Sequence, residues 1–71
     1  MTRYLIIIEE TETGFSAYSP DLTGCVSTGT SRAAVEDNMR EAIAAHLEEL
    51  REDGLPAPKP SSAAAYVEVG A

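Results

Sequence analysis

The stretch SPDLTGCVSTGTS, residues Ser19–Ser31, decides the fold, and its first half has the chemistry of a turn. Pro20 has no backbone N–H to donate to a β-ladder and disfavours helical backbone in the residue before it. A strand that enters the stretch is therefore predicted to end near Ser19. The Asp21 carboxylate can accept hydrogen bonds from backbone amides just downstream, and Gly24 can adopt a positive φ. The first half thus predicts a tight connection between two strands.

The second half of the stretch predicts a short strand followed by the start of a helix. Cys25–Thr28 is the strand, and the hydroxyl of Thr30 or Ser31 can cap the first free amides of the helix. Apolar residues then recur at helical spacing on one face: Val35, Met39, Ile43, Leu47 and Leu50. This stripe is typical of an amphipathic helix of about six turns that packs one face on a core. Gly54 suits the left-handed position at its C-terminal end.

Four further segments complete the predicted architecture. Arg3–Glu9 is an apolar, β-branched run and Phe15–Tyr18 alternates apolar and polar residues, so the polar loop between them predicts a β-hairpin. Leu55–Pro60 contains three of the four prolines and is predicted to be a stiff, extended connection. Ala65–Val69 alternates again and predicts a fourth strand. The fold class is α+β: a small β-β-β-α-β domain, in which an antiparallel three-stranded meander plus a fourth strand carries one long amphipathic helix on one face.

A chain of 71 residues with one cysteine needs additional stabilisation. A domain of this size buries only about 60% of the surface that its unfolded chain exposes. A single cysteine excludes a disulfide framework. Leu5–Ile8 supplies apolar side chains to both faces of the sheet, whereas one helix covers only one face. We therefore expect a homo-oligomer, a dimer or a tetramer, in which another chain covers the second face.

The charge of the chain limits the class of partner. Twelve acidic and five basic residues give a net charge of −7, so direct binding to nucleic acid is not expected and a basic partner is favoured. The apolar run Leu5–Ile8 is too short for a signal peptide or a membrane span. The lone cysteine fits a reducing compartment, so we expect a cytoplasmic protein without membrane contact.

Catalytic interpretations of the polar residues are weaker than structural ones. A nucleophilic Cys25 would need His46 within hydrogen-bond reach and a third group to orient the imidazole. Cys25 instead begins a strand, and His46 lies beside the apolar stripe of the helix. Both are interpreted as residues of the core or its edge. With one histidine and one cysteine, no metal site and no cofactor are expected.

One enzymatic alternative stays open. Asp21 together with Glu9, Glu10 and Glu12 could gather carboxylates for the metal ions of a metal-dependent nuclease with a ribonuclease-H-like fold. The glutamates fall in or beside the first loop, and Asp21 is explained as a turn former, so the chain is interpreted as a non-enzyme. Cleavage of RNA in the presence of Mg²⁺ or Mn²⁺ would decide between these two interpretations.

Two blocks of the sequence carry a resemblance to a known family. They are YSPDLTGC, Tyr18–Cys25, and DGLPAP, Asp53–Pro58. At their spacing behind an apolar first strand, they make the chain resemble the HicB-type antitoxins of bacterial toxin–antitoxin systems. The resemblance implies a partial ribonuclease-H-like fold and a protein that binds and silences a small basic toxin that cleaves mRNA. Many members carry an extra C-terminal DNA-binding module, and residues 1–71 are expected to form a single HicB-like domain without one.

The mechanism expected from this resemblance and from the charge is occlusion, in which an acidic surface covers the RNA-binding face of the toxin. The predicted partner contacts are Pro20, Asp21, Leu22, Glu41, Glu48 and Glu52. A free-standing oligomeric interaction module without a toxin is the second alternative. The product of the neighbouring gene would distinguish the two.

Overall fold

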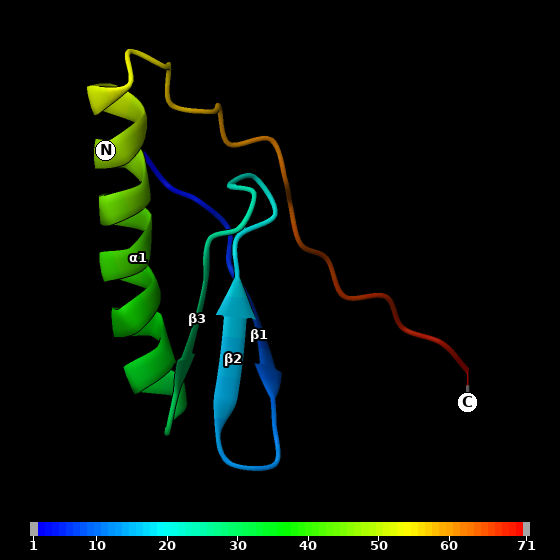
Figure 1. The fold of residues 1–71 in the computed structure, drawn as a ribbon. Coiled ribbons are helices and arrows are strands. Elements are labelled where there is room, and N and C mark those ends of the chain that lie inside the picture. The colour runs from blue at the N-terminus through cyan, green and yellow to red at the C-terminus, as the bar shows by residue number, and fades with distance from the viewer. Residues whose placement is uncertain (1, 71) are drawn as a thin grey trace.

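The computed structural model describes residues 2–70, which form three strands and one long helix (Figure 1). The strands are β1 (Ile7–Glu10), β2 (Phe15–Tyr18) and β3 (Val26–Gly29), and the helix is α1 (Arg32–Glu52). The strands form one antiparallel sheet in the order β1-β2-β3. The predicted α+β class, three-stranded meander and amphipathic helix are confirmed.

The first strand is shorter than the apolar run that predicted it. The ladder between β1 and β2 extends from the pair Ile7–Tyr18 to the pair Glu10–Phe15. Upstream of Ile7 the chain loses its partner because β2 ends and enters the turn. The Leu5 carbonyl there accepts a 2.9 Å hydrogen bond from the Ser19 hydroxyl instead. A side chain thus continues the pairing where the ladder stops.

Alternation of side chains gives the sheet a helix-covered face and an outer face. Ile8 pairs with Ala17 on the covered face, where Ala17 is buried against the helix. Ile7, Tyr18 and Val26 are direct neighbours in register, so they form a row across all three strands on the outer face. Tyr18 is 42% exposed and Val26 is 65% exposed. We call this set the outer row.

The core lies between the covered face and α1, which packs on β3 and β2. Its buried members come from β2, the turn, and the first half of the helix: Ala17, Leu22, Cys25, Val35 and Met39. A residue without a side chain, Gly29, is needed where β3 meets the helix. A Cβ on Gly29 would lie 2.6 Å from the Val35 backbone nitrogen, closer than real Cβ atoms approach. The helix start and the end of β3 are therefore packed backbone against backbone.

The predicted turn is confirmed and closes on itself through backbone hydrogen bonds. The Leu22 amide donates to the Ser19 carbonyl at 3.2 Å, and the Cys25 amide donates to the Leu22 carbonyl at 3.1 Å. Gly24 has φ +78°, which a side chain would strain. This closed loop turns Leu22 inward, where it is 1% exposed.

The helix ends follow the predicted chemistry. Ser31 has extended backbone, and its hydroxyl accepts a 3.0 Å hydrogen bond from the Ala34 amide. At the other end Gly54 has φ +71°, and the Leu55 amide donates to the Leu50 carbonyl at 2.9 Å. The helix is therefore capped at both ends by local interactions.

The fourth strand predicted at Ala65–Val69 is not formed. These residues lie in an extended tail that leaves the body of the domain and runs in the same direction as β1, apart from it (Figure 1). Tyr66 is 105% exposed, Val67 81% and Val69 78%. The alternating pattern predicted the extended backbone, but a strand also requires a neighbour to hydrogen-bond with. Within this single chain the tail has none over residues 65–70.

Candidate partner-binding site

Asp21 joins the turn to the start of the tail. Its carboxylate accepts hydrogen bonds from the hydroxyls of Ser62 at 2.9 Å and Ser61 at 3.1 Å. It also accepts from the backbone amides of Ser61 at 3.2 Å and Ser62 at 3.3 Å. The Ser62 hydroxyl is the main cause of a lowered pKa for Asp21, with the two amides and the Ser61 hydroxyl adding to it and partial desolvation opposing it. We call this set of contacts the Asp21 clamp.

A second contact holds the proline-rich connection against the domain. The Tyr4 hydroxyl donates a 2.6 Å hydrogen bond to the Pro58 carbonyl. Pro58 is half-buried, whereas its neighbours on both sides are exposed. The tail is thus fixed to the domain as far as Ser62, and its apolar end projects beyond the Asp21 clamp.

The structure separates the three partner contacts predicted in the turn. Pro20 is exposed and Asp21 is half-buried in its clamp. Leu22 fills the core, so its side chain does not reach the surface of this chain. The turn therefore offers a proline ring and a hydrogen-bonded carboxylate, while the leucine holds the loop in place.

The predicted helix contacts share one face of α1. At about 100° per residue, Glu41, Glu48 and Glu52 lie within about 40° of one another around the helix axis. All three are exposed. They lie on the side opposite the buried residues Val35 and Met39. We call this set the acidic helix face.

Two arginines pair with acids on or beside this face. Arg51 donates two hydrogen bonds to the Glu48 carboxylate, and the pair raises the pKa of Arg51. Arg40 contacts Asp37 at 2.8 Å. Both pairs are exposed, so they contribute little to stability. The Glu41 and Glu52 carboxylates carry much of the negative charge that this face presents.

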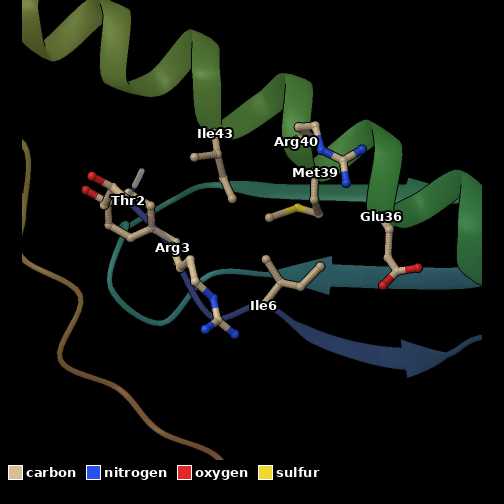
Figure 2. Close-up of a pocket in the computed structure, with 8 residues that line it drawn as sticks. Thr2, Arg3, Ile6, Glu36, Met39, Arg40 and Ile43 are labelled. Atoms are coloured by element: carbon tan, nitrogen blue, oxygen red, sulfur yellow. The ribbon is translucent and has the colours of Figure 1, made fainter.

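A hollow of about 350 Å³ lies between the segment before β1 and α1. Figure 2 shows Ile6 on one side and Met39 and Ile43 on the other, with charged side chains around them. The charged groups are Arg3, Glu36 and Arg40. An apolar floor with charges of both signs at its rim suits a side chain of a protein partner. Sequence reasoning missed this hollow because its floor combines a core stripe with a segment outside the strands.

The structure places Cys25 and His46 along one shallow hollow of about 170 Å³, together with Glu49. Burial raises the pKa of the Cys25 thiol, which disfavours the thiolate that a nucleophile requires. Cys25 is 5% exposed and belongs to the core cluster. The arrangement supports the interpretation of Cys25 as a core residue.

The carboxylates of the nuclease alternative are not brought together. Asp21 follows the end of β2, whereas Glu9 and Glu10 pair with the first half of that strand. In the part of the chain from 2 to 70, no three histidine, cysteine, aspartate or glutamate residues could jointly hold a metal ion. The same part contains no helix with the length and apolarity needed to cross a membrane.

The chain matches one protein family and is similar to two relatives of known sequence. A family model described as the HicB_like antitoxin of bacterial toxin-antitoxin system matches residues 4–70. An uncharacterized 14.9 kDa protein in the rep-hol intergenic region of Haemophilus phage HP1 is 34% identical over 64 residues, which are 90% of this chain and 48% of that protein. A UPF0150 protein of Helicobacter pylori (strain J99) is 43% identical over 49 residues, covering 69% of this chain and 68% of that protein. The chain thus spans about half the length of the phage relative.

Two solved structures share the fold. A chain of the "HicA3 and HicB3 toxin-antitoxin complex" superposes with a TM-score of 0.72 and 40% identity, covering 84% of this chain and 70% of that chain. The "Antitoxin HicB3 crystal structure" gives a TM-score of 0.71 and 42% identity, covering 80% of this chain and 42% of that chain. At 40% and 42% identity, the similarity of this chain to both structures extends from the fold to the sequence.

Proposed function

Because this chain belongs to the HicB-like antitoxins of bacterial toxin–antitoxin systems, we propose that it is a non-enzymatic antitoxin that binds and neutralises a small basic toxin. The match of the family model to residues 4–70 is the observation that carries this proposal. A related antitoxin has been solved as the "HicA3 and HicB3 toxin-antitoxin complex", which supports a toxin of the HicA type as the partner. The toxin's activity in this proposal is mRNA cleavage.

The mechanism that we propose is occlusion of the toxin's RNA-binding face. A surface that binds RNA must be rich in lysine and arginine, because it has to neutralise phosphates. The net charge of −7 and the acidic helix face give this chain a complementary field, which would speed encounter and orient the toxin. A toxin held in this way cannot reach its RNA substrate.

We assign the contacts to two exposed elements. The acidic helix face contributes Glu41, Glu48 and Glu52, and the turn contributes Pro20 and Asp21. Leu22 acts indirectly in this proposal, since its burial fixes the loop that presents the other two turn residues.

We also propose that the protein acts as a homodimer or tetramer in the cytoplasm. The outer row Ile7, Tyr18 and Val26 supports self-association, because it puts adjacent apolar side chains on the sheet face that the helix does not cover. A reduced thiol, as in Cys25, suits a reducing compartment. A partial ribonuclease-H-like β-β-β-α-β topology would be completed if Ala65–Val69 gained a strand partner.

Co-expression with a neighbouring gene tests the proposal. The small basic protein encoded beside this gene should arrest growth when expressed alone, and this chain should restore growth and co-purify with it. A chain that neither co-purifies with that protein nor restores growth would refute the antitoxin role. RNA cleavage by the purified chain alone, abolished by Asp21→Asn, would refute its assignment as a non-enzyme.

A further inference from the structure

We infer that the tail segment Ala65–Val69 of one copy forms a fourth strand on the β1 edge of a second copy, and that the exchange is reciprocal. This inference concerns the assembly of the protein with itself and goes beyond toxin binding. It rests on an open sheet edge, a strand-like segment without a partner, and an excess of exposed surface.

The sheet has two edges, and they differ in protection. At β3, the Asn38 side chain donates a 2.8 Å hydrogen bond to the Thr28 carbonyl, and α1 packs along the strand. At β1, the structure of residues 2–70 shows neither a strand nor a helix beyond the edge (Figure 1). An edge of this kind presents free backbone donors and acceptors that template another strand. Its first two residues, Ile7 and Ile8, are apolar and half-buried, as are Leu5 and Ile6 just before the strand.

The tail has the properties of the missing strand. It is extended, it carries Tyr66, Val67 and Val69, and each of these side chains is at least 78% exposed. Apolar and β-branched residues in an alternating pattern suit a half-buried strand position. Left in water, the same side chains gain nothing from the hydrophobic effect.

The tail is fixed at its start in a position that leaves its own β1 edge free. The Asp21 clamp and the bond from Tyr4 to Pro58 hold it as far as Ser62. Beyond the clamp it runs apart from β1 without pairing, and residues 64–66 and 5–8 contribute to the lining of one open hollow of about 400 Å³. The prolines of the connection make its path stiff. The chain therefore presents its strand outward and keeps its edge open.

The chain exposes more surface than a compact monomer of its mass. A compact monomer of 7.5 kDa is expected to expose about 4,250 Å². This chain exposes 5714 Å², about 1,500 Å² more than that expectation. Its radius of gyration is 13.9 Å, against about 11 Å for a compact chain of this length. A stable interface buries about 800 Å² on each partner, so the excess is sufficient for one.

A second copy is the partner that satisfies both features at once. Every copy carries one open β1 edge and one unpaired tail strand. In a dimer with two-fold symmetry, the tail of each copy therefore pairs with the β1 edge of the other. Such an isologous exchange closes at the dimer and leaves no further copy to recruit through these elements. The edge and the tail then share one sheet in each half of the dimer.

Two variants of the full chain test the exchange without any toxin. Val67→Pro removes a backbone donor from the tail, and Val67→Thr keeps the donor and the β-branched shape. Val67 is exposed and outside the core, so circular dichroism should show the same helix content in both. Sedimentation equilibrium should find a dimer for the unmodified chain and for Val67→Thr. The dissociation constant of the Val67→Pro dimer should be at least about tenfold larger than that of the unmodified dimer.

A mixed-label experiment identifies which edge the tail occupies. Isotope-labelled and unlabelled chains are mixed, unfolded and refolded together, and filtered nuclear Overhauser effects are recorded between the methyls of Val67 or Val69 and those of Leu5 or Ile7. Contacts between labelled and unlabelled chains are expected. Contacts confined to one chain, a monomer at all concentrations, or a Val67→Pro dimer as tight as the unmodified one would overturn the inference. Because the toxin is absent, these results are independent of the antitoxin test.

Discussion

The Ser62 hydroxyl donates a 2.9 Å hydrogen bond to the Asp21 carboxylate, across a sequence separation of 41 residues. This contact joins the turn that follows β2 to the start of the C-terminal tail. It gives Asp21 a structural role in addition to the partner contact that we propose. The path of the tail therefore depends on the Asp21 carboxylate as well as on the hydrogen bond from Tyr4 to Pro58.

Asp21→Asn should loosen the tail without affecting the core. An amide has one acceptor oxygen in place of two charged ones, so most of the four bonds to Ser61 and Ser62 weaken. Hydrogen exchange should speed up at the Ser61 and Ser62 amides, while the protection of α1 stays unchanged. Glu12→Gln, a change of the same charge in the exposed hairpin loop, is the matched control and should alter neither. Unchanged exchange at Ser61 and Ser62 in Asp21→Asn would contradict the Asp21 clamp.

The same contact predicts an acid-dependent release of the tail. The pKa of Asp21 is lowered in the folded chain, mainly by the Ser62 hydroxyl. The stabilisation is therefore fully present above the usual pKa of an aspartate, about 4, and is lost as the pH falls through the lower folded value. Amide chemical shifts of Ser61 and Ser62 should titrate in that acidic range and stay flat above it. In Asp21→Asn this titration should disappear, and a titration that persists there would assign it to another group.

Gly29→Ala should destabilise the domain. The added Cβ would lie 2.6 Å from the Val35 backbone nitrogen, and neither β3 nor the helix start can move away without losing packing. The expected loss in the free energy of unfolding is about 1–3 kcal/mol, measured by urea denaturation. Gly70→Ala is the control, because no atom lies within 4 Å of the position of its added Cβ. Equal stability of the two variants would show that the contact at Gly29 is not close.

Variants at Leu22 and Pro20 should differ in the free energy of unfolding, because Leu22 packs in the core and Pro20 lies on the surface. Leu22→Ala leaves a cavity under the turn and should lower the free energy of unfolding by about 2–5 kcal/mol, which is most of what a domain of this size has. Pro20→Ala changes an exposed residue and should shift the free energy by less than about 1 kcal/mol. If Leu22→Ala were as stable as Pro20→Ala, the burial of Leu22 would be contradicted.

Sequence reasoning worked where the determinants are local. The hydroxyl of Ser31 before a helical stripe, the positive φ available to Gly24, and the proline that ends β2 are each signals carried by a few adjacent residues. The structure contains all three features. The apolar stripe likewise identified Val35 and Met39 as core residues before their partners were known.

Prediction failed where the outcome depends on residues far apart. The alternation at Ala65–Val69 specifies an extended segment, but its partner is set by the path of the connection and by the edge it meets. The Asp21 clamp has no local signal, because aspartate in a turn is already explained by the turn itself. The inward position of Leu22 depends on how the loop closes, which a single leucine among polar residues does not reveal.

The most direct test of the antitoxin proposal is the association rate with the small basic protein encoded beside this gene. Glu41→Gln/Glu48→Gln/Glu52→Gln removes three charges from the acidic helix face. Its matched control, Glu9→Gln/Glu10→Gln/Glu12→Gln, removes three charges around the first hairpin. The account predicts association about tenfold slower and less dependent on salt for the helix variant, with a much smaller effect for the control. Equal rates for the two variants would contradict binding through the acidic helix face.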